Sequence, residues 1–256
     1  HENYFVASWQ NDSLHESAGI NASNLGYKNA YILAPNYQAG KDALAGFKRY
    51  VDGEIVGEIY TKLGQTDYAA EIAKIRAADP EMVFHFLPGG MGINFMKQYD
   101  QAGLGDDIPL VLAAPSADVN ILRAVGSAMV GINNTSHWNH DLDNDANKGF
   151  VAGFEEKYDR VPTVYASQGY DTARLIASAL RATGGKVTDD MDGFRSALRA
   201  ADFDSVRGPF KFNTNNHPIQ NWYGRVVVEE NGEFHNKIIG VVAENHEDAY
   251  VGDCKM

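Results

Sequence analysis

Residues 26–49, GYKNAYILAPNYQAGKDALAGFKR, contain the pattern on which the fold prediction rests. The segment 28–34 is short and mostly apolar, which is typical of a strand buried in a sheet. Apolar residues then recur at helical spacing through 38–50, at Ala39, Ala43, Leu44 and Phe47. A strand that leads into a helix through a short polar link is one half of a βαβ unit.

The same alternation extends through the first half of the chain. A helix with an Asn/Asp/Ser start and a Gly stop is expected over 11–26. Further strands are expected over 54–60, 82–87, 108–114 and 129–135, and further helices over 68–78, 92–104 and 119–126. Strands that alternate with helices of this length predict a parallel sheet with helices on both faces, and hence an α/β fold.

The second half is mostly helical. Helices are expected over 147–158, 165–183 and 190–201, and short antiparallel strands over 209–213, 221–230 and 234–242, with a turn at 230–232. Helices of an α/β layer must bury their apolar stripe against a sheet, and few strands are available here. Either these helices form a bundle of their own, or their strands lie outside these 256 residues.

Composition narrows the class of protein. The chain is 44% hydrophobic and 22% charged, as expected for a folded domain. Its formal net charge of -12 repels phosphate backbones, so we expect no nucleic-acid partner. Because no apolar run is long enough to span a bilayer, we expect no direct membrane insertion.

Motifs for catalysis and for metal binding are missing. The sequence has no HExxH, GxSxG, GxxxxGK[ST] or strand-linked GxGxxG, so we expect no enzyme and no cofactor. His137 and His140 precede several aspartates, but this segment lacks a complete ligand set and also fits a polar loop before a helix. The segment 141–152 departs from a calcium loop, with Ala146 and Ala152 where Gly and Glu are needed. We therefore expect no metal.

Polar and aromatic residues follow several predicted strands. Ligands of open α/β sheets bind beyond the carboxyl ends of the strands, and backbone amides of the glycine-rich turn 87–95 (LPGGMGINF) could meet a carboxylate there. Ordinary turns and loop packing explain each residue equally well. The residues that follow strands include Trp9, Tyr37, Pro88, Gly89, Gly90, Ser116, His137 and Trp138.

Four segments together carry a family resemblance. They are residues 26–49, LGQTDYAAEIAKIRAADPEMVFHFLPGGMGINFMKQYDQAGL, YASQGYDTARLIASALRATGG and FDSVRGPFKFNTNNHPIQNWY. In this order they resemble type I periplasmic solute-binding proteins of ABC importers, in the leucine/isoleucine/valine-binding branch. The resemblance runs through nearly the whole chain. It implies a non-enzymatic protein that closes two Rossmann-like lobes around one ligand and delivers it to a membrane permease.

The resemblance also implies a division into lobes. Residues 12–135 and 223–244 would form the second lobe, and 141–219 the later part of the first lobe. Hinge crossings would lie at 5–9, 135–139 and 220–223. The first part of lobe 1 would be absent, so that we expect a fragment with one parallel-sheet lobe and one incomplete lobe.

The resemblance is closest to a subgroup that binds aromatic carboxylates. Tyr37 matches the ligand-stacking tyrosine of the family, while residues 113–117 (AAPSA) lack the acidic group that amino-acid binders use. An amino-acid binder, branched-chain or other, and a ligand-sensing receptor domain of the same fold stay as alternatives. The predicted ligand-binding residues are Trp9, Tyr37, Pro88, Gly89, Gly90, Ser116, His137, Trp138 and Tyr165.

The resemblance further implies a periplasmic protein, secreted by a signal peptide outside these residues. Cys254 is the one cysteine, and relatives that share the CKM ending tend to have a cysteine just before the first crossing. The resemblance therefore implies that Cys254 is disulfide-bonded in the full protein, to a cysteine that would precede His1, as an oxidising compartment allows, and that it is free in these 256 residues.

Overall fold

The computed structural model of the protein describes residues 1–255, which form two compact units. The sheet unit consists of residues 14–136 and 223–242. The helical unit consists of residues 1–13, 137–222 and the described residues from 243 onward. The chain passes between them near residues 13, 136, 222 and 242, and the assignment of the units to lobes stays a prediction.

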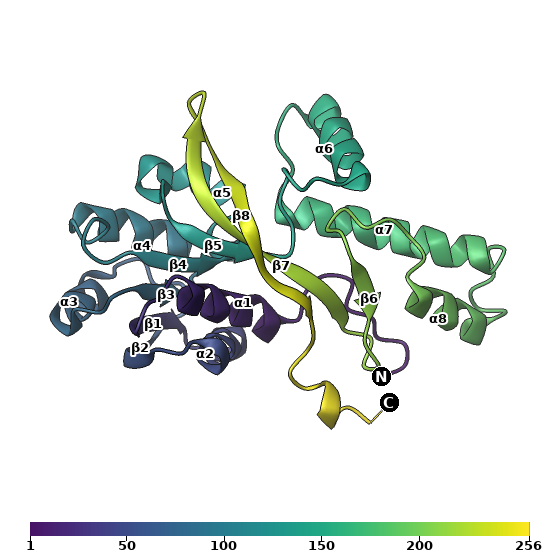
Figure 1. Ribbon diagram of the computed structural model, residues 1–256, viewed down its shortest axis with the longest axis horizontal. Coiled ribbons are helices and arrows are strands. Elements are labelled where there is room, and N and C mark those ends of the chain that lie inside the picture. The colour runs from purple at the N-terminus through teal and green to yellow at the C-terminus, as the bar shows by residue number, and fades with distance from the viewer. Residues whose placement is uncertain (256) are drawn as a thin grey trace. The chain divides into compact units, whose positions relative to one another are not determined.

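The sheet unit contains the predicted alternation of strands and helices (Figure 1). Strands β1 to β5 run parallel in the order β2-β1-β3-β4-β5, and β7 pairs with β5 in the antiparallel sense. Its elements are α1 (Asn11–Asn24), β1 (Asn29–Pro35), α2 (Gln38–Tyr50), β2 (Glu54–Thr61), α3 (Ala69–Ala78), β3 (Val83–His85), α4 (Gly90–Gln101), β4 (Leu110–Ala113), α5 (Val119–Val125), β5 (Asn133–Ser136) and two short 3₁₀ turns, Ala114–Ser116 and Gly126–Met129. The predicted α/β class is confirmed.

Both faces of this sheet are covered by helices. Val83 and Leu33 belong to the main core cluster together with apolar residues of α3, α4 and α5. Phe84 points the other way and stacks on Phe47 of α2, with ring centroids 4.2 Å apart. Because successive strand residues point to opposite faces, continuous apolar runs such as 30–35 are what a sheet buried on both sides requires.

Glycines let two helices begin directly behind their strands. A Cβ at Gly40 of α2 would lie 2.0 Å from the Pro35 carbonyl oxygen, and one at Gly92 of α4 would lie 2.2 Å from the Leu87 carbonyl oxygen. Both distances are far below van der Waals contact, so no larger residue fits without a shift of the backbone. These close approaches fix where the loops beyond β1 and β3 lie.

The helical unit contains α6 (Asp145–Tyr158), α7 (Val164–Ala182) and α8 (Met191–Ala200). Asn144, Thr163 and Asp190 cap their N-termini through side-chain oxygens. The unit also contains β6 (Phe210–Phe212), which pairs with the first residues of β7. No side chain of α8 is buried in the described structure, although its sequence is amphipathic.

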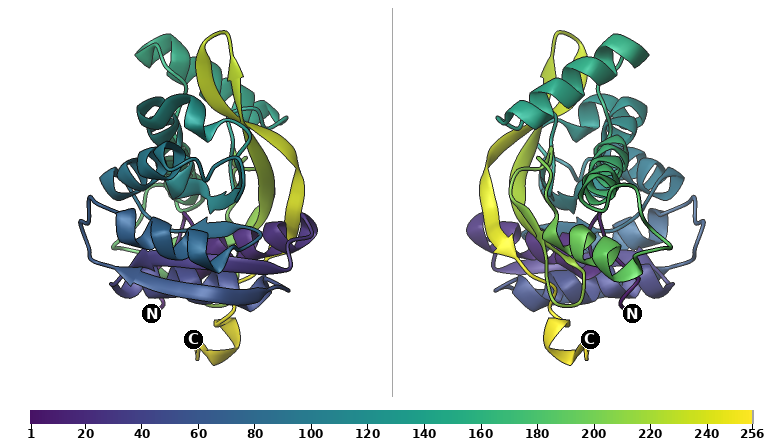
Figure 2. Two further views of the ribbon diagram at one scale, coloured as in Figure 1. Left: turned by 90° about the vertical axis from the view of Figure 1, so that its left-hand side faces the viewer. Right: turned by 90° about the vertical axis from the view of Figure 1, so that its right-hand side faces the viewer.

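The hairpin of β7 (Pro218–Glu230) and β8 (Glu233–His246) is longer than predicted. Its strands have 13 and 14 residues, and the ribbon twists strongly along its length (Figure 2). The strands predicted over 221–230 and 234–242 are present but longer than expected. The extent of β8 was underestimated because much of it is exposed and lacks a clear alternation of apolar and polar residues. Asn231 and Gly232 have φ values of 55° and 81°, and such a turn matches the twist of the strands on both sides.

No helix within residues 1–255 is long and apolar enough to cross a membrane.

Candidate functional site

Three predicted site segments of the sheet unit follow parallel strands. Tyr37 lies just after β1, Pro88–Gly90 after β3, and Ser116 after β4. The Tyr37 ring is half-buried and lies nearly parallel to Phe86, with centroids 6.4 Å apart and an interplanar angle of 9°. Burial raises the pKa of the Tyr37 hydroxyl, so this group stays a neutral hydrogen-bond donor.

The glycine-rich turn leads directly into α4. Gly89 has a φ of 61°, a conformation that favours glycine, and the helix begins at Gly90. Gly89 and Gly90 are exposed. The first amides of a helix have no partner within the helix and lie at its positive end, so this turn offers donors to an anion.

Two buried histidines accompany these segments. His15 of α1 contacts Phe86 edge to face, with ring centroids 4.7 Å apart. His85 is the last residue of β3, and its carbonyl oxygen accepts a hydrogen bond of 3.4 Å from the Ser116 hydroxyl. Burial lowers the pKa of each imidazole to about 3, so both rings are neutral at pH 7.

The helical unit contains a row of four aromatic side chains, which we call the aromatic row: Tyr165, Trp9, His137 and Trp222. Trp9 lies 6.1 Å from Tyr165 and 5.3 Å from His137, measured between ring centroids. His137 in turn contacts Trp222 edge to face at 5.6 Å. The Tyr165 side chain is 52% exposed, whereas Trp222 is buried, so the row runs from the surface to the interior of the chain.

The three predicted hinge crossings supply three members of the aromatic row. Trp9 belongs to crossing 5–9, His137 to 135–139 and Trp222 to 220–223. Tyr165 comes instead from the first turn of α7. Each pair of rings in contact joins residues at least 85 positions apart in sequence, which no local pattern of the sequence reveals.

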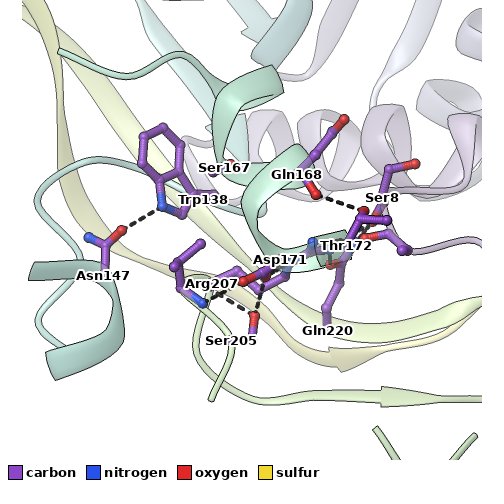
Figure 3. A network of polar contacts seen from close by, with 12 residues as sticks. Ser8, Trp138, Asn147, Ser167, Gln168, Asp171, Thr172, Ser205, Arg207 and Gln220 are labelled. Atoms are coloured by element: carbon purple, nitrogen blue, oxygen red, sulfur yellow. Dashed lines mark hydrogen bonds and ion pairs between the residues drawn. The ribbon is translucent and has the colours of Figure 1, made fainter. Parts of the chain in front are cut away.

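Trp138 is placed differently from its neighbour His137. Its side chain is buried, and its indole Nε1 donates a hydrogen bond of 2.7 Å to Asn147 Oδ1 of α6 (Figure 3). Its ring packs edge to face on Phe150. The structure therefore brings Trp9, His137 and Tyr165 together and places Trp138 against α6.

Residues 113–117 carry no charge, and Asp118 directly precedes α5 as its N-cap residue. Within residues 1–255, no group of three or more His, Cys, Asp or Glu side chains is placed to hold a metal ion. Cys254 is exposed.

Phe86, His15 and Trp222 were missed by sequence reasoning. Phe86 lies in an apolar run that reads as core, and His15 lies inside a helix with no motif around it. Trp222 had a usable signal, because it falls within the predicted third crossing.

The sequence of residues 1–233 matches a protein family described as periplasmic binding protein. The chain belongs to the periplasmic binding protein family. This membership confirms the predicted resemblance and the type I fold, and it makes the chain a solute-binding protein of the periplasm rather than an enzyme. A comparison with curated proteins gave no match.

Solved structures resemble this periplasmic binding protein closely. A solute-binding protein of an ABC transporter from R. palustris, in complex with benzoate, is 32% identical with a TM-score of 0.90; the match covers 100% of this chain and 69% of that one. A counterpart from Rhodopseudomonas palustris BisB5, in complex with 3,4-dihydroxybenzoic acid, is 31% identical with a TM-score of 0.83, over 97% and 68% of the two chains. A third, from R. palustris with 4-hydroxybenzoate, is 27% identical with a TM-score of 0.83, over 94% and 67%.

Proposed function

We propose that this chain is the substrate-binding component of an ABC importer and that it binds a small aromatic carboxylate of the benzoate type. The aromatic row, with its exposed end at Tyr165, is the observation that carries the ligand class. An aromatic ligand ring gains contact area and favourable ring geometry on such a surface. The resemblance to benzoate-binding and hydroxybenzoate-binding proteins supports the same class.

Each unit carries predicted ligand-binding groups of its own. Tyr37 would stack on the ligand ring, as its neighbour Phe86 holds it in place. The amides at Gly89 and Gly90 and the Ser116 hydroxyl would supply hydrogen bonds. Trp9, His137 and Tyr165 would contact the ring, with Pro88 and Trp138 as further predicted site residues. The mechanism would be hinge closure with no chemical step.

The lack of an acidic side chain in residues 113–117 disfavours an α-amino acid as ligand. An ammonium group needs a charged or hydrogen-bonding partner when it leaves water. We also propose that the full gene product is secreted by means of a signal peptide and that it passes its ligand to a membrane permease.

Thermal unfolding with candidate ligands tests the ligand class. The full gene product that carries these residues should unfold about 5 °C higher with benzoate or a hydroxybenzoate at about 100 times Kd, because a ligand that binds only the folded state stabilises it by about 2.7 kcal/mol. Leucine at the same concentration should leave the midpoint unchanged. A shift with leucine and none with the benzoates would overturn the aromatic ligand class.

Loss of uptake tests the transport role. A strain that lacks the gene should take up radiolabelled benzoate more slowly, and the gene on a plasmid should restore the rate. Unchanged uptake together with tight binding in vitro would overturn the role in import and leave the ligand class standing.

A further inference from the structure

A buried ion pair lies beneath the first and third crossings of the helical unit. The Arg207 and Asp171 side chains are 2% and 1% exposed, and Arg207 Nε donates to Asp171 Oδ2 at 2.9 Å. The Ser205 hydroxyl donates to the same carboxylate at 2.5 Å, and the Val206 amide donates to its other oxygen at 3.0 Å. Asp171 is thus held in one orientation by the segment that carries Arg207 (Figure 3).

The other end of the guanidinium reaches two segments far apart in sequence. Arg207 Nη2 donates to the Ala7 carbonyl oxygen at 2.8 Å, and Nη1 donates to the Ser8 carbonyl oxygen at 2.9 Å. Nη1 also donates to Gln220 Oε1 at 2.9 Å, and Gln220 Nε2 donates in turn to the Ser8 carbonyl oxygen at 3.3 Å. One side chain therefore joins the first crossing to the third.

These contacts lie next to the aromatic row. Trp9 directly follows Ser8. Trp222 lies two residues after Gln220 on strand β7, so the Gln220 and Trp222 side chains share one face of that strand. Ser8 and Gln220 thus lie one and two residues from the two indoles that flank His137.

Stability alone is a poor explanation for this ion pair. Desolvation opposes the burial of two charges, and well-packed apolar residues often stabilise a fold as much or more. A planar guanidinium, however, offers several donors in a fixed geometry and can hold separate backbone segments in one arrangement. Its face also lies 5.0 Å from the centroid of the Phe210 ring, which restricts its orientation further.

We propose that Arg207, oriented by Asp171, is a positioning residue that holds Trp9 and Trp222 beside His137 and so prepares the aromatic row for the ligand. The proposal rests on the proposed function as far as the ligand is concerned. The arrangement of the indoles, however, is a property of the ligand-free chain, and it can be measured without any ligand.

Fluorine NMR of 5-fluorotryptophan-labelled protein tests the positioning. The chain has three tryptophans, so three resonances are expected, and each is assigned with a Trp→Phe variant. Arg207→Lys keeps the positive charge but loses the planar guanidinium with its several N–H donors. It should shift or broaden the Trp9 and Trp222 resonances and leave the Trp138 resonance unchanged. Leu175→Ala is the matched control, because Leu175 is a buried residue of α7 in the same unit.

Ligand affinity completes the test. Both variants are measured at a temperature at which circular dichroism shows them to be folded. Arg207→Lys should raise the Kd for benzoate about tenfold. Leu175→Ala should lower the unfolding midpoint but keep the Kd within about twofold of the parent value. Unmoved Trp9 and Trp222 resonances in Arg207→Lys would overturn the positioning role. Moved resonances with benzoate binding absent in every variant, the parent included, would overturn the proposed ligand and leave the positioning role intact.

If Arg207→Lys does not fold, Gln220→Leu gives the second test. This change removes the side-chain link between the third crossing and Ser8 but keeps the ion pair. It should move the Trp222 resonance, and an unmoved resonance in this variant would count against the proposal.

Discussion

At the scale of the residue, the Tyr37 ring is the clearest candidate for a direct ligand contact. It is half-buried, it is held parallel to Phe86, and its hydroxyl stays protonated. Tyr37→Ala should raise the Kd for benzoate by roughly tenfold to a hundredfold, because the lost ring contact is worth about 1.5–3 kcal/mol. Isothermal titration calorimetry measures the change.

Tyr37→Phe is the control for this prediction. It keeps the ring and should bind benzoate within about threefold of the parent protein, since only one hydroxyl is lost. An unchanged Kd in Tyr37→Ala would remove Tyr37 from the site.

The buried histidines make stability depend on pH. Their folded-state pKa is about 3 and their ordinary value is 6.5, so the unfolded chain binds more protons between these values. The stability conferred by the neutral rings is therefore complete above pH 6.5 and is lost as the pH falls toward 3. At pH 5 the loss is on the order of 2 kcal/mol for each histidine.

Urea unfolding at pH 7 and pH 5 checks this expectation. His15→Gln cannot take up that proton, so its free energy of unfolding should fall less between the two pH values than that of the parent. Equal losses in both proteins would show that His15 does not contribute to the pH dependence.

At the scale of the element, the start of α2 depends on a glycine. Gly40→Ala would place a Cβ 2.0 Å from the Pro35 carbonyl oxygen, so α2 must move away from β1. We expect the free energy of unfolding to fall by about 1–3 kcal/mol, as for other overpacked sites. Gly153→Ala in α6 is the matched control; its Cβ would meet nothing within 4 Å, and it should raise stability by about 0.5–1 kcal/mol.

Guanidinium denaturation of both variants measures these opposite effects. If Gly40→Ala were as stable as Gly153→Ala, then α2 would not need its close approach to β1.

The order of strands and helices could be predicted because most elements of the sheet unit carry a strong local pattern. The run 28–34 reads as a buried strand and lies within one residue of β1, and 38–50 shows helical spacing with the bounds of α2. The length of β8 could not be predicted, because a half-exposed strand shows little alternation of apolar and polar residues.

Candidate site residues at strand ends could likewise be predicted from their position. The ion pair of Arg207 and Asp171 could not be predicted, because the two residues are 36 positions apart and each, taken alone, is expected to be a solvent-exposed charge. Burial of a charge is decided by packing, which the local sequence does not encode.

At the scale of the whole molecule, the proposed hinge closure should change the dimensions of the protein. Small-angle X-ray scattering of the full gene product should give a smaller radius of gyration with benzoate than without it, and no change with leucine. Equal radii with and without bound benzoate would contradict closure and leave binding itself unaffected.

The division of the chain between its units also has a consequence for biosynthesis. The sheet unit includes residues 223–242, of which 223–226 pair with β5. The helical unit gathers the segments 1–13 and 137–222 and the described residues from 243 onward. A nascent chain emerges from its N-terminus, so neither unit can finish folding until the residues beyond 222 have left the ribosome. Long-range pairings of this kind also fold slowly. Late, slow completion keeps the growing chain unfolded for longer after its first residues have been made.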